Sequence, residues 1–258
     1  MTDRPKKLLS QNSELRKAGV FNWTLPAFVV TRENGERFNV CPQAGACARV
    51  CYARFGTYRF SNVQARHLAN LEYVLGDLSG WREQMRQELK AKKFRPSGNA
   101  HTLDHDDTDK WIAWWVAAGG KAVRIHDAGD FFSADYLEAW RHIARTTTDV
   151  LFYAYTKEVA LIKERGLYPL NMRFIFSYGG RQDILIDDQV DRHADVFPSL
   201  EALDAAGYYN QEENDLLAVV APTHKIGIVA NNIPTARKRF QGKAMRYIIQ
   251  RADDTLSA

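Results

Sequence analysis

The chain has three cysteines, and all of them lie within eleven positions. Cys41, Cys47 and Cys51 are separated by five and then by three residues. Pro42 restricts the backbone after the first cysteine, and Gly45 allows a loop to fold closely around a bound group. One helical turn between Cys47 and Cys51 would place both sulfurs on the same face. The pattern predicts one metal centre bound by these three thiolates.

The kind of metal follows from the number of thiolates. Structural zinc needs four protein ligands, usually in pairs separated by two to four residues, and this spacing fits that template badly. Three thiolates with an open position suit a [4Fe–4S] cluster whose fourth iron binds another group. We therefore predict a [4Fe–4S] cluster. The alternatives are zinc and three buried thiols that pack as small apolar side chains.

The first part of the chain is expected to surround the cysteines rather than to form the core. Residues 1–24 mix polar, basic and turn-forming types, which predicts a segment that wraps the domain. Residues 25–60 are expected to form a strand pair and the cysteine loop, with strands from Ala27 to Thr31 and from Arg37 to Val40 around a turn at Asn34. Three helices and one loop should follow: Ser61 to Leu75, Leu78 to Lys92, the polar loop Arg95 to His105, and Asp107 to Ala118.

The rest of residues 61–258 alternates short apolar strands with helices. The expected strands are Ala122 to His126, Val150 to Tyr155, Arg173 to Ser177, Leu216 to Val220 and Ile226 to Val229. The expected helices are Ser133 to Arg145 and Glu158 to Arg165. This rhythm is typical of a parallel sheet buried on both faces. We expect residues 1–258 to form a single α/β domain, a complete or partial β/α (TIM-like) barrel with an N-terminal cysteine-containing loop. A doubly wound sheet is the alternative.

Polar residues follow the strands at the points where the strands end, and parallel α/β folds place their sites there. His126, Asp127 and Asp130 are therefore candidates to contact a cofactor or a cluster ligand. Their alternative role is an Asx-type turn in which Asp130 caps the next helix. Lys157 is the candidate catalytic residue, as a Schiff-base or anion-binding lysine, and a solvated lysine is its alternative.

Charge gives less information than the cysteines do. The formal net charge of +4 neither proves nor excludes a nucleic-acid partner. Two basic runs are solvated faces or, if they share one surface, a site for phosphate backbones. These runs are Lys90, Lys92, Lys93 and Arg95, and Arg237, Lys238, Arg239 and Lys243. With no signal peptide and no long apolar segment, we expect a cytoplasmic protein with no membrane partner.

Several blocks of the sequence resemble the phage and actinobacterial "gene product 88" family. They are Leu8 to Leu15, Leu25 to Ala27, Cys41 to Ala53, Val123 to Ser133 and Phe152 to Lys157. The family's layout is similar to that of radical S-adenosylmethionine enzymes, which space their cysteines by three and then two residues. That similarity implies S-adenosylmethionine as a cofactor, with Gly129 and Asp130 as the counterpart of the turn that holds its methionine amine.

Two main functions follow from these expectations. The first is an iron–sulfur enzyme that binds a small molecule, such as S-adenosylmethionine, at an open cluster iron. The second is a non-enzymatic iron–sulfur protein that binds nucleic acid or a host partner, with a structural or redox-sensing cluster. A zinc-stabilised phage accessory protein is a third.

Overall fold

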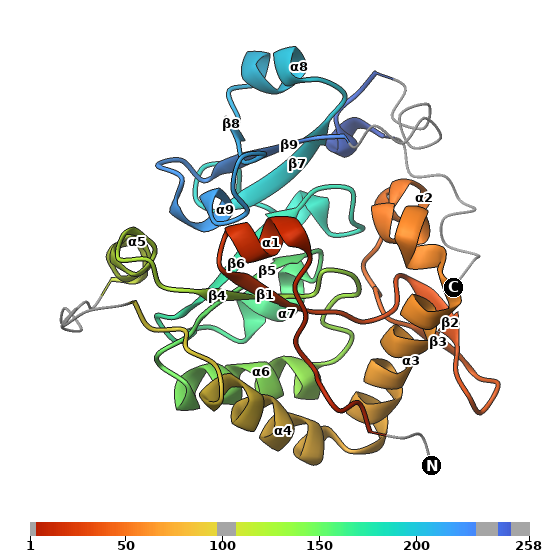
Figure 1. Cartoon of the computed structure of the whole chain (residues 1–258). Coiled ribbons are helices and arrows are strands. Elements are labelled where there is room, and N and C mark those ends of the chain that lie inside the picture. Colours follow the sequence, from red (N-terminus) through yellow and green to blue (C-terminus); the bar gives the residue numbers. More distant parts are fainter. Residues whose placement is uncertain (1–3, 97–106, 231–241, 249–258) are drawn as a thin grey trace.

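Short apolar runs that alternate with helices form one parallel sheet, around which the other elements are arranged (Figure 1). The structure is a computed structural model and describes residues 4–96, 107–230 and 242–248. Across the sheet the strands are β1 (Val20–Trp23), β4 (Ala122–Ile125), β5 (Leu151–Thr156), β6 (Met172–Ser177), β7 (His193–Phe197), β9 (Lys225–Val229) and β8 (Tyr209–Asn210). All pairings within it are parallel, which confirms the α/β class.

Helices cover both faces of this sheet. They are α1 (Ser13–Lys17), α2 (Cys47–Val50), α3 (Ser61–Gly76), α4 (Leu78–Lys90), α5 (Thr108–Ala117), α6 (Ala134–Thr146), α7 (Val159–Glu164), α8 (Leu200–Ala205) and α9 (Leu217–Val220). The short 3-10 turns are η1 (Tyr52–Arg54), η2 (Gly56–Arg59), η3 (Asp183–Leu185) and η4 (Met245–Tyr247). Helices α4 and α6 contact each other on one face, and Figure 1 shows them side by side. Within the described parts of the chain, no helix is long and apolar enough to cross a membrane.

The alternation of side chains along each strand gives the sheet two different faces. One register row, Trp23, Ile125, Ala154 and Phe174, is apolar and lies on the side of α4 and α6. The adjacent row is polar: Asn22, Arg124, Tyr153 and Arg173. Arg173 donates to the Val219 carbonyl of α9 at 2.8 Å and pairs with Asp109 of α5, so those helices lie over the polar face.

Aromatic packing forms the centre of the apolar face. Trp81 of α4 is fully buried, and its ring contacts those of Trp23, Tyr136 and Trp140 at centroid distances of 5.1 to 5.5 Å. The hydroxyl of Tyr136 accepts a 2.7 Å hydrogen bond from the indole of Trp23. One cluster of four large rings thus joins β1, α4 and α6.

The N-terminal segment belongs to the core, so the prediction that residues 1–24 only wrap the domain was wrong. Strand β1 pairs with β4 along its whole length, and Leu8 and Leu15 are buried. Strand β1 was not predicted because it is only four residues long and one of them, Asn22, is polar. The strand pair around Asn34 was predicted correctly and forms β2 (Val29–Thr31) and β3 (Arg37–Asn39).

The sheet is open in the described residues, where no pairing joins β1 to the far edge. A complete barrel is therefore not shown. Strand β9 lies between β7 and β8, which breaks the simple succession that a barrel requires. The expected strand from Leu216 to Val220 is instead helix α9, whose start is held by Asn214, a side-chain acceptor for the Leu216 amide at 2.9 Å.

The aromatic cluster gives a test of the packing. Trp81→Ala should lower the free energy of unfolding by about 3–5 kcal/mol, because it leaves a cavity among three other rings. Urea denaturation followed by circular dichroism measures the change. Leu167→Ala is the control, since that side chain is 93% exposed and should change stability by less than about 0.5 kcal/mol. Equal effects of the two substitutions would contradict the described core.

Candidate functional site at the carboxyl edge of the sheet

The cysteine segment lies across the carboxyl ends of β5 and β6. The amides of Gly45 and Cys47 both donate to the Gly179 carbonyl, at 3.2 and 3.0 Å. The Gln43 amide donates to Glu158 Oε1 at 3.1 Å, just beyond β5. A bridge between Ala44 and the residue after Gly179 completes the attachment. Hydrogen bonds donated by its backbone amides therefore hold this segment at the edge of the sheet where the sequence predicted the site.

The three cysteines are partly buried, and the surroundings of their thiols favour the protonated form. Desolvation raises the pKa of Cys41 and Cys47, and it raises the pKa of Cys51 to about 12. The negative charge of Asp130 adds to the effect at Cys41 and Cys47, whereas Lys157 opposes it at Cys47. Because only the thiolate is a good nucleophile or metal ligand, these thiols are weakly reactive at neutral pH.

The prediction of an iron–sulfur function was wrong. In residues 4–96, 107–230 and 242–248, no group of three or more His, Cys, Asp or Glu side chains could hold a metal ion. Cys41 instead accepts the Phe28 amide at 3.4 Å and packs with Phe28, Ala44 and Ala48. Cys47 packs in the same cluster and in a second one with Met245. Such packing is what the alternative of apolar thiols would give, and ligation of a metal by Cys41, Cys47 and Cys51 stays a prediction.

The turn after β4 uses its polar residues to join segments of the chain. Asp130 is buried and accepts hydrogen bonds from the amides of Phe131 and Lys157, both at 2.9 Å, and from the Thr156 hydroxyl at 2.6 Å. Ser133, rather than Asp130, caps α6 through the Tyr136 amide. Burial raises the pKa of Asp130, and the three hydrogen bonds oppose that shift.

His126 and Gly129 have conformations that this turn requires. His126 has a positive φ of 65° and is buried, and its Nε2 lies 2.9 Å from the Tyr136 hydroxyl. Burial lowers the pKa of His126 to about 3, so the ring is neutral at pH 7. Gly129 has φ +89°, and a Cβ there would lie 2.7 Å from the Cβ of Leu25. These residues shape the turn, and their binding of a cofactor such as S-adenosylmethionine remains a prediction.

Lys157 links two strands. Its ammonium group donates to the Ser177 carbonyl, the Ser177 hydroxyl and the Tyr178 carbonyl, each at 2.9 Å. All three N–H groups are therefore used, and they fix the end of β6 beside the end of β5. A catalytic role for Lys157 would require these bonds to break, and it remains a prediction.

Glu158 is a titratable group that the sequence did not single out. It is 5% exposed, and burial together with the charge of Asp130 raises the pKa of Glu158 to about 8. Its side chain holds the Gln43 amide, so a protonated carboxyl links the cysteine segment to β5 at neutral pH. Nothing in the local sequence distinguishes it from a surface glutamate at the start of a helix.

A hydrogen-bonded network that the sequence did not predict lies on the polar face of the sheet. Arg124 donates to Asp215 Oδ1 at 3.4 Å and to the Tyr52 hydroxyl at 3.2 Å. Tyr153 donates to the other oxygen of Asp215, and Tyr52 donates to the carbonyl of Asp127. The Asp127 carboxylate accepts a further bond from the hydroxyl of Tyr58. The one available signal was a charged residue inside the apolar strand β4.

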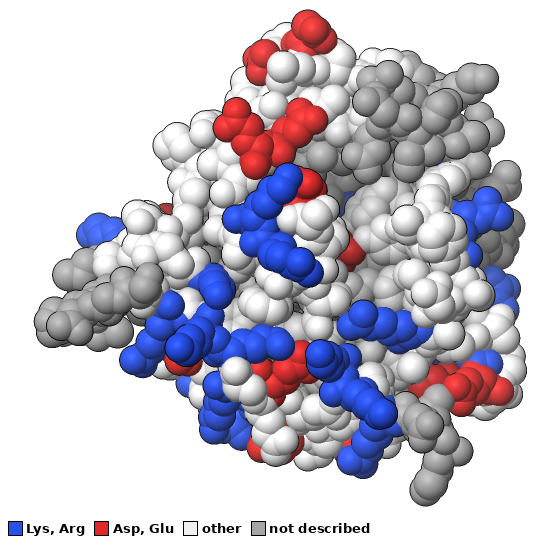
Figure 2. Space-filling model, viewed as in Figure 1, with Lys and Arg blue, Asp and Glu red and all other residues white. Residues whose placement is uncertain are grey.

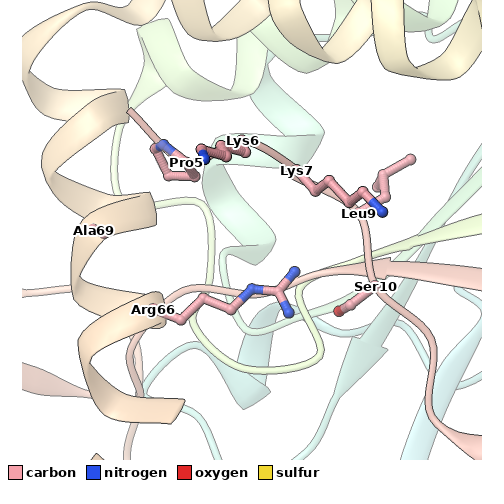
Figure 3. Close-up of a pocket in the computed structure, with 7 residues that line it drawn as sticks. All are labelled: Pro5, Lys6, Lys7, Leu9, Ser10, Arg66 and Ala69. Atoms are coloured by element: carbon pink, nitrogen blue, oxygen red, sulfur yellow. The ribbon is translucent and has the colours of Figure 1, made fainter. Parts of the chain in front are cut away.

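A pocket lies between the N-terminal segment and α3 (Figure 3). Figure 3 shows the guanidinium group of Arg66 extending from α3 toward Ser10. The side chains of Lys6, Lys7 and Arg66 are exposed, and none of them forms an ion pair within the described residues. The pocket is lined by Pro5, Lys6, Lys7, Leu9, Ser10, Arg66 and Ala69. Its lining therefore includes three exposed cations.

The described residues form an α/β protein with an open parallel sheet, and the cysteine segment lies across the carboxyl ends of two of its strands. The chain belongs to the Gene product 88 family, whose model matches residues 3–254. It is 29% identical to the Gene 88 protein of Mycobacterium phage L5 over 134 residues, and 34% identical to that of Mycobacterium phage D29 over 126 residues. Each alignment covers 48% of this chain and 45% of the phage protein. No solved structure matches the chain.

These comparisons confirm the predicted resemblance to bacteriophage proteins. They give no support to the radical S-adenosylmethionine layout, and the chain spans less than half the length of the curated relatives that it matches.

The buried Glu158 predicts a pH dependence of stability. Its pKa is about 8 in the folded protein and about 4.3 in an unfolded chain, so the folded state binds the extra proton between these values. Its contribution to stability is therefore lost as the pH rises from about 4 to about 8. Glu158→Gln keeps the acceptor for Gln43 and should stabilise the protein at pH 8 by on the order of a few kcal/mol.

Urea denaturation from pH 5 to pH 9 measures this effect. Glu213→Gln, at an exposed position, is the control for losing one carboxylate. Parallel stability curves for the wild type and Glu158→Gln across this range would refute the assignment.

The protonated thiols predict slow alkylation. Iodoacetamide should modify Cys51 in the folded protein roughly a thousand-fold more slowly than in urea at pH 7, because the thiolate is nearly absent. Mass spectrometry of quenched samples gives the rate at each cysteine. The folded-state rates should rise about ten-fold per pH unit between pH 7 and pH 9. Rates that match those of the unfolded chain would show that the thiols are ionised or open to solvent.

Proposed function

We propose that this chain binds the phosphate backbone of a nucleic acid through the basic surface formed by residues 4–10 and α3. The carrying observation is the set of exposed cations around the pocket, Lys6, Lys7 and Arg66, none of which forms an ion pair with a described acidic side chain. Phosphate oxygens supply the negative charge and the acceptors that such cations lack. The planar guanidinium of Arg66 can donate two parallel hydrogen bonds to one phosphate group.

Some other cations of the N-terminal segment and of the α4 region have acidic partners. Arg4 pairs with Asp77 at 2.6 Å, Arg86 with Glu83 at 2.8 Å, and Lys92 with Glu88 at 3.5 Å. Figure 2 shows Lys and Arg side chains spread over the lower half of this face, while patches of Asp and Glu lie both among them and toward α8 at the top. The pocket therefore holds a local excess of positive charge that the small net charge does not reveal.

An extended polyanion fits this surface better than an isolated anion does. Arg59, just before α3, and Arg16 of α1 are also exposed, with no ion-pair partner among the described residues. In the first predicted basic run, Arg95 pairs with Asp149, while Lys90 and Lys93 are exposed. The second run lies mostly outside the described residues, at Arg237, Lys238 and Arg239. A single phosphate group could contact only the pocket, whereas a polymer could contact cations on several segments.

Charge reversal tests the proposal. Lys7→Glu with Arg66→Glu should weaken binding to a 30-nucleotide DNA by at least about ten-fold, and should make the slope of log K against log salt less steep by about 2. Fluorescence anisotropy from 50 to 200 mM salt measures both quantities. The loss of two phosphate contacts is the physical reason for the change in slope.

A matched control separates the pocket from overall charge. Lys110→Glu with Arg165→Glu changes the net charge by the same amount at exposed positions on α5 and after α7. Figure 1 shows α5 on the opposite side of the molecule from α3. This control should bind like the wild type. No binding by the wild type at 50 mM salt, or equal loss in the two double variants, would refute the proposal.

A further inference from the structure

Phe60 lies directly before α3 with its side chain exposed. It is 59% exposed, and its ring belongs to none of the apolar clusters and makes none of the ring contacts found among the described residues. Its backbone carbonyl accepts the amides of Val63 and Gln64, both at 3.0 Å, so the main chain at this position is fixed. A lone exposed phenylalanine is ordinary on a protein surface, and its significance depends on its neighbours.

The neighbours of Phe60 are cations without partners. Arg59 precedes it and Arg66 follows it by six residues in α3, which corresponds to about 9 Å along a helix. Both are exposed, and neither forms an ion pair within the described residues. Arg66 lines the pocket together with Lys6 and Lys7. The aromatic ring therefore lies in a segment of the chain with exposed cations on both sides of it in the sequence.

We infer that Phe60 stacks on a nucleobase, and that the nucleic acid which the basic surface binds is single-stranded. This inference rests on the proposed function. Proteins that bind single strands combine cations along the backbone with aromatic side chains on which bases stack. In a duplex the base faces are already stacked on each other, so an exposed ring has no base face to cover. The cations would bind the backbone, and Phe60 would stack on a base.

Two substitutions test the stacking role. Phe60→Ala should weaken binding to a 12-nucleotide single-stranded DNA by about ten-fold and leave binding to the matching duplex unchanged. The salt slope should stay the same, because no charge is removed. Phe60→Trp should restore binding, and its added fluorescence, measured against the wild type, should be quenched by the single strand and not by heparin. Leu200→Ala, at a 44% exposed position on α8, is the control for losing an exposed apolar side chain.

The possible outcomes distinguish a failure of base stacking by Phe60 from a failure of the proposed nucleic-acid binding. If the wild type binds DNA but Phe60→Ala binds the single strand equally well, stacking is refuted and the basic surface still stands. A wild type that prefers the duplex also refutes stacking and leaves the basic surface in place. If the wild type binds neither form at 50 mM salt, the proposed function fails and this inference fails with it. Thermal unfolding of each variant shows whether a loss of affinity comes from misfolding.

Discussion

The buried carboxylate of Asp130 is the interaction on which the carboxyl edge of the sheet depends. Its oxygens accept three hydrogen bonds from the turn after β4 and from the end of β5, while its own amide donates to the Val40 carbonyl at 3.2 Å. A buried charge without such donors would be costly. The carboxylate therefore depends on the turn after β4 and on the end of β5, and the backbone amide of Asp130 attaches the residue after β3 to the same turn.

The position of the cysteine segment follows from this arrangement. Val40 precedes Cys41, so the contact with Asp130 fixes where the segment begins, and the Gly179 carbonyl fixes its middle through two amides. Gly179 has φ +95°, and a Cβ there would lie 2.5 Å from Cγ of Met245, so glycine is needed at this crossing. Hydrogen bonds and close packing thus place the thiols at the carboxyl edge of the sheet. A short spacing between cysteines is compatible with a metal centre and with apolar packing of thiols, and it does not reveal the tertiary contacts that position the segment.

The sequence predicted elements whose pattern is regular and local. Helix α3, expected from Ser61 to Leu75, ends one residue later, and strand β5 is shifted by one residue. Strand β7 was missed because His193 and Asp195 are polar, although both are almost completely buried. Their burial depends on partners far along the chain, since Asp195 pairs with Arg246 at 2.6 Å and His193 lies 2.9 Å from the Tyr208 hydroxyl. Such partners have no signature in a local window of sequence.

The same reason explains why the basic pocket was not predicted. In the sequence, runs of consecutive cations indicated possible phosphate sites. In the folded protein some of these cations form ion pairs, as Lys92 does with Glu88. The pocket joins residues 6 and 7 to residue 66, and that juxtaposition exists only because the N-terminal segment passes α3. The chance that a cation meets a phosphate depends on whether an acid already neutralises it, rather than on how many cations adjoin it in sequence. The positions of acidic side chains in the folded protein therefore define this surface as much as its own lysines and arginines do.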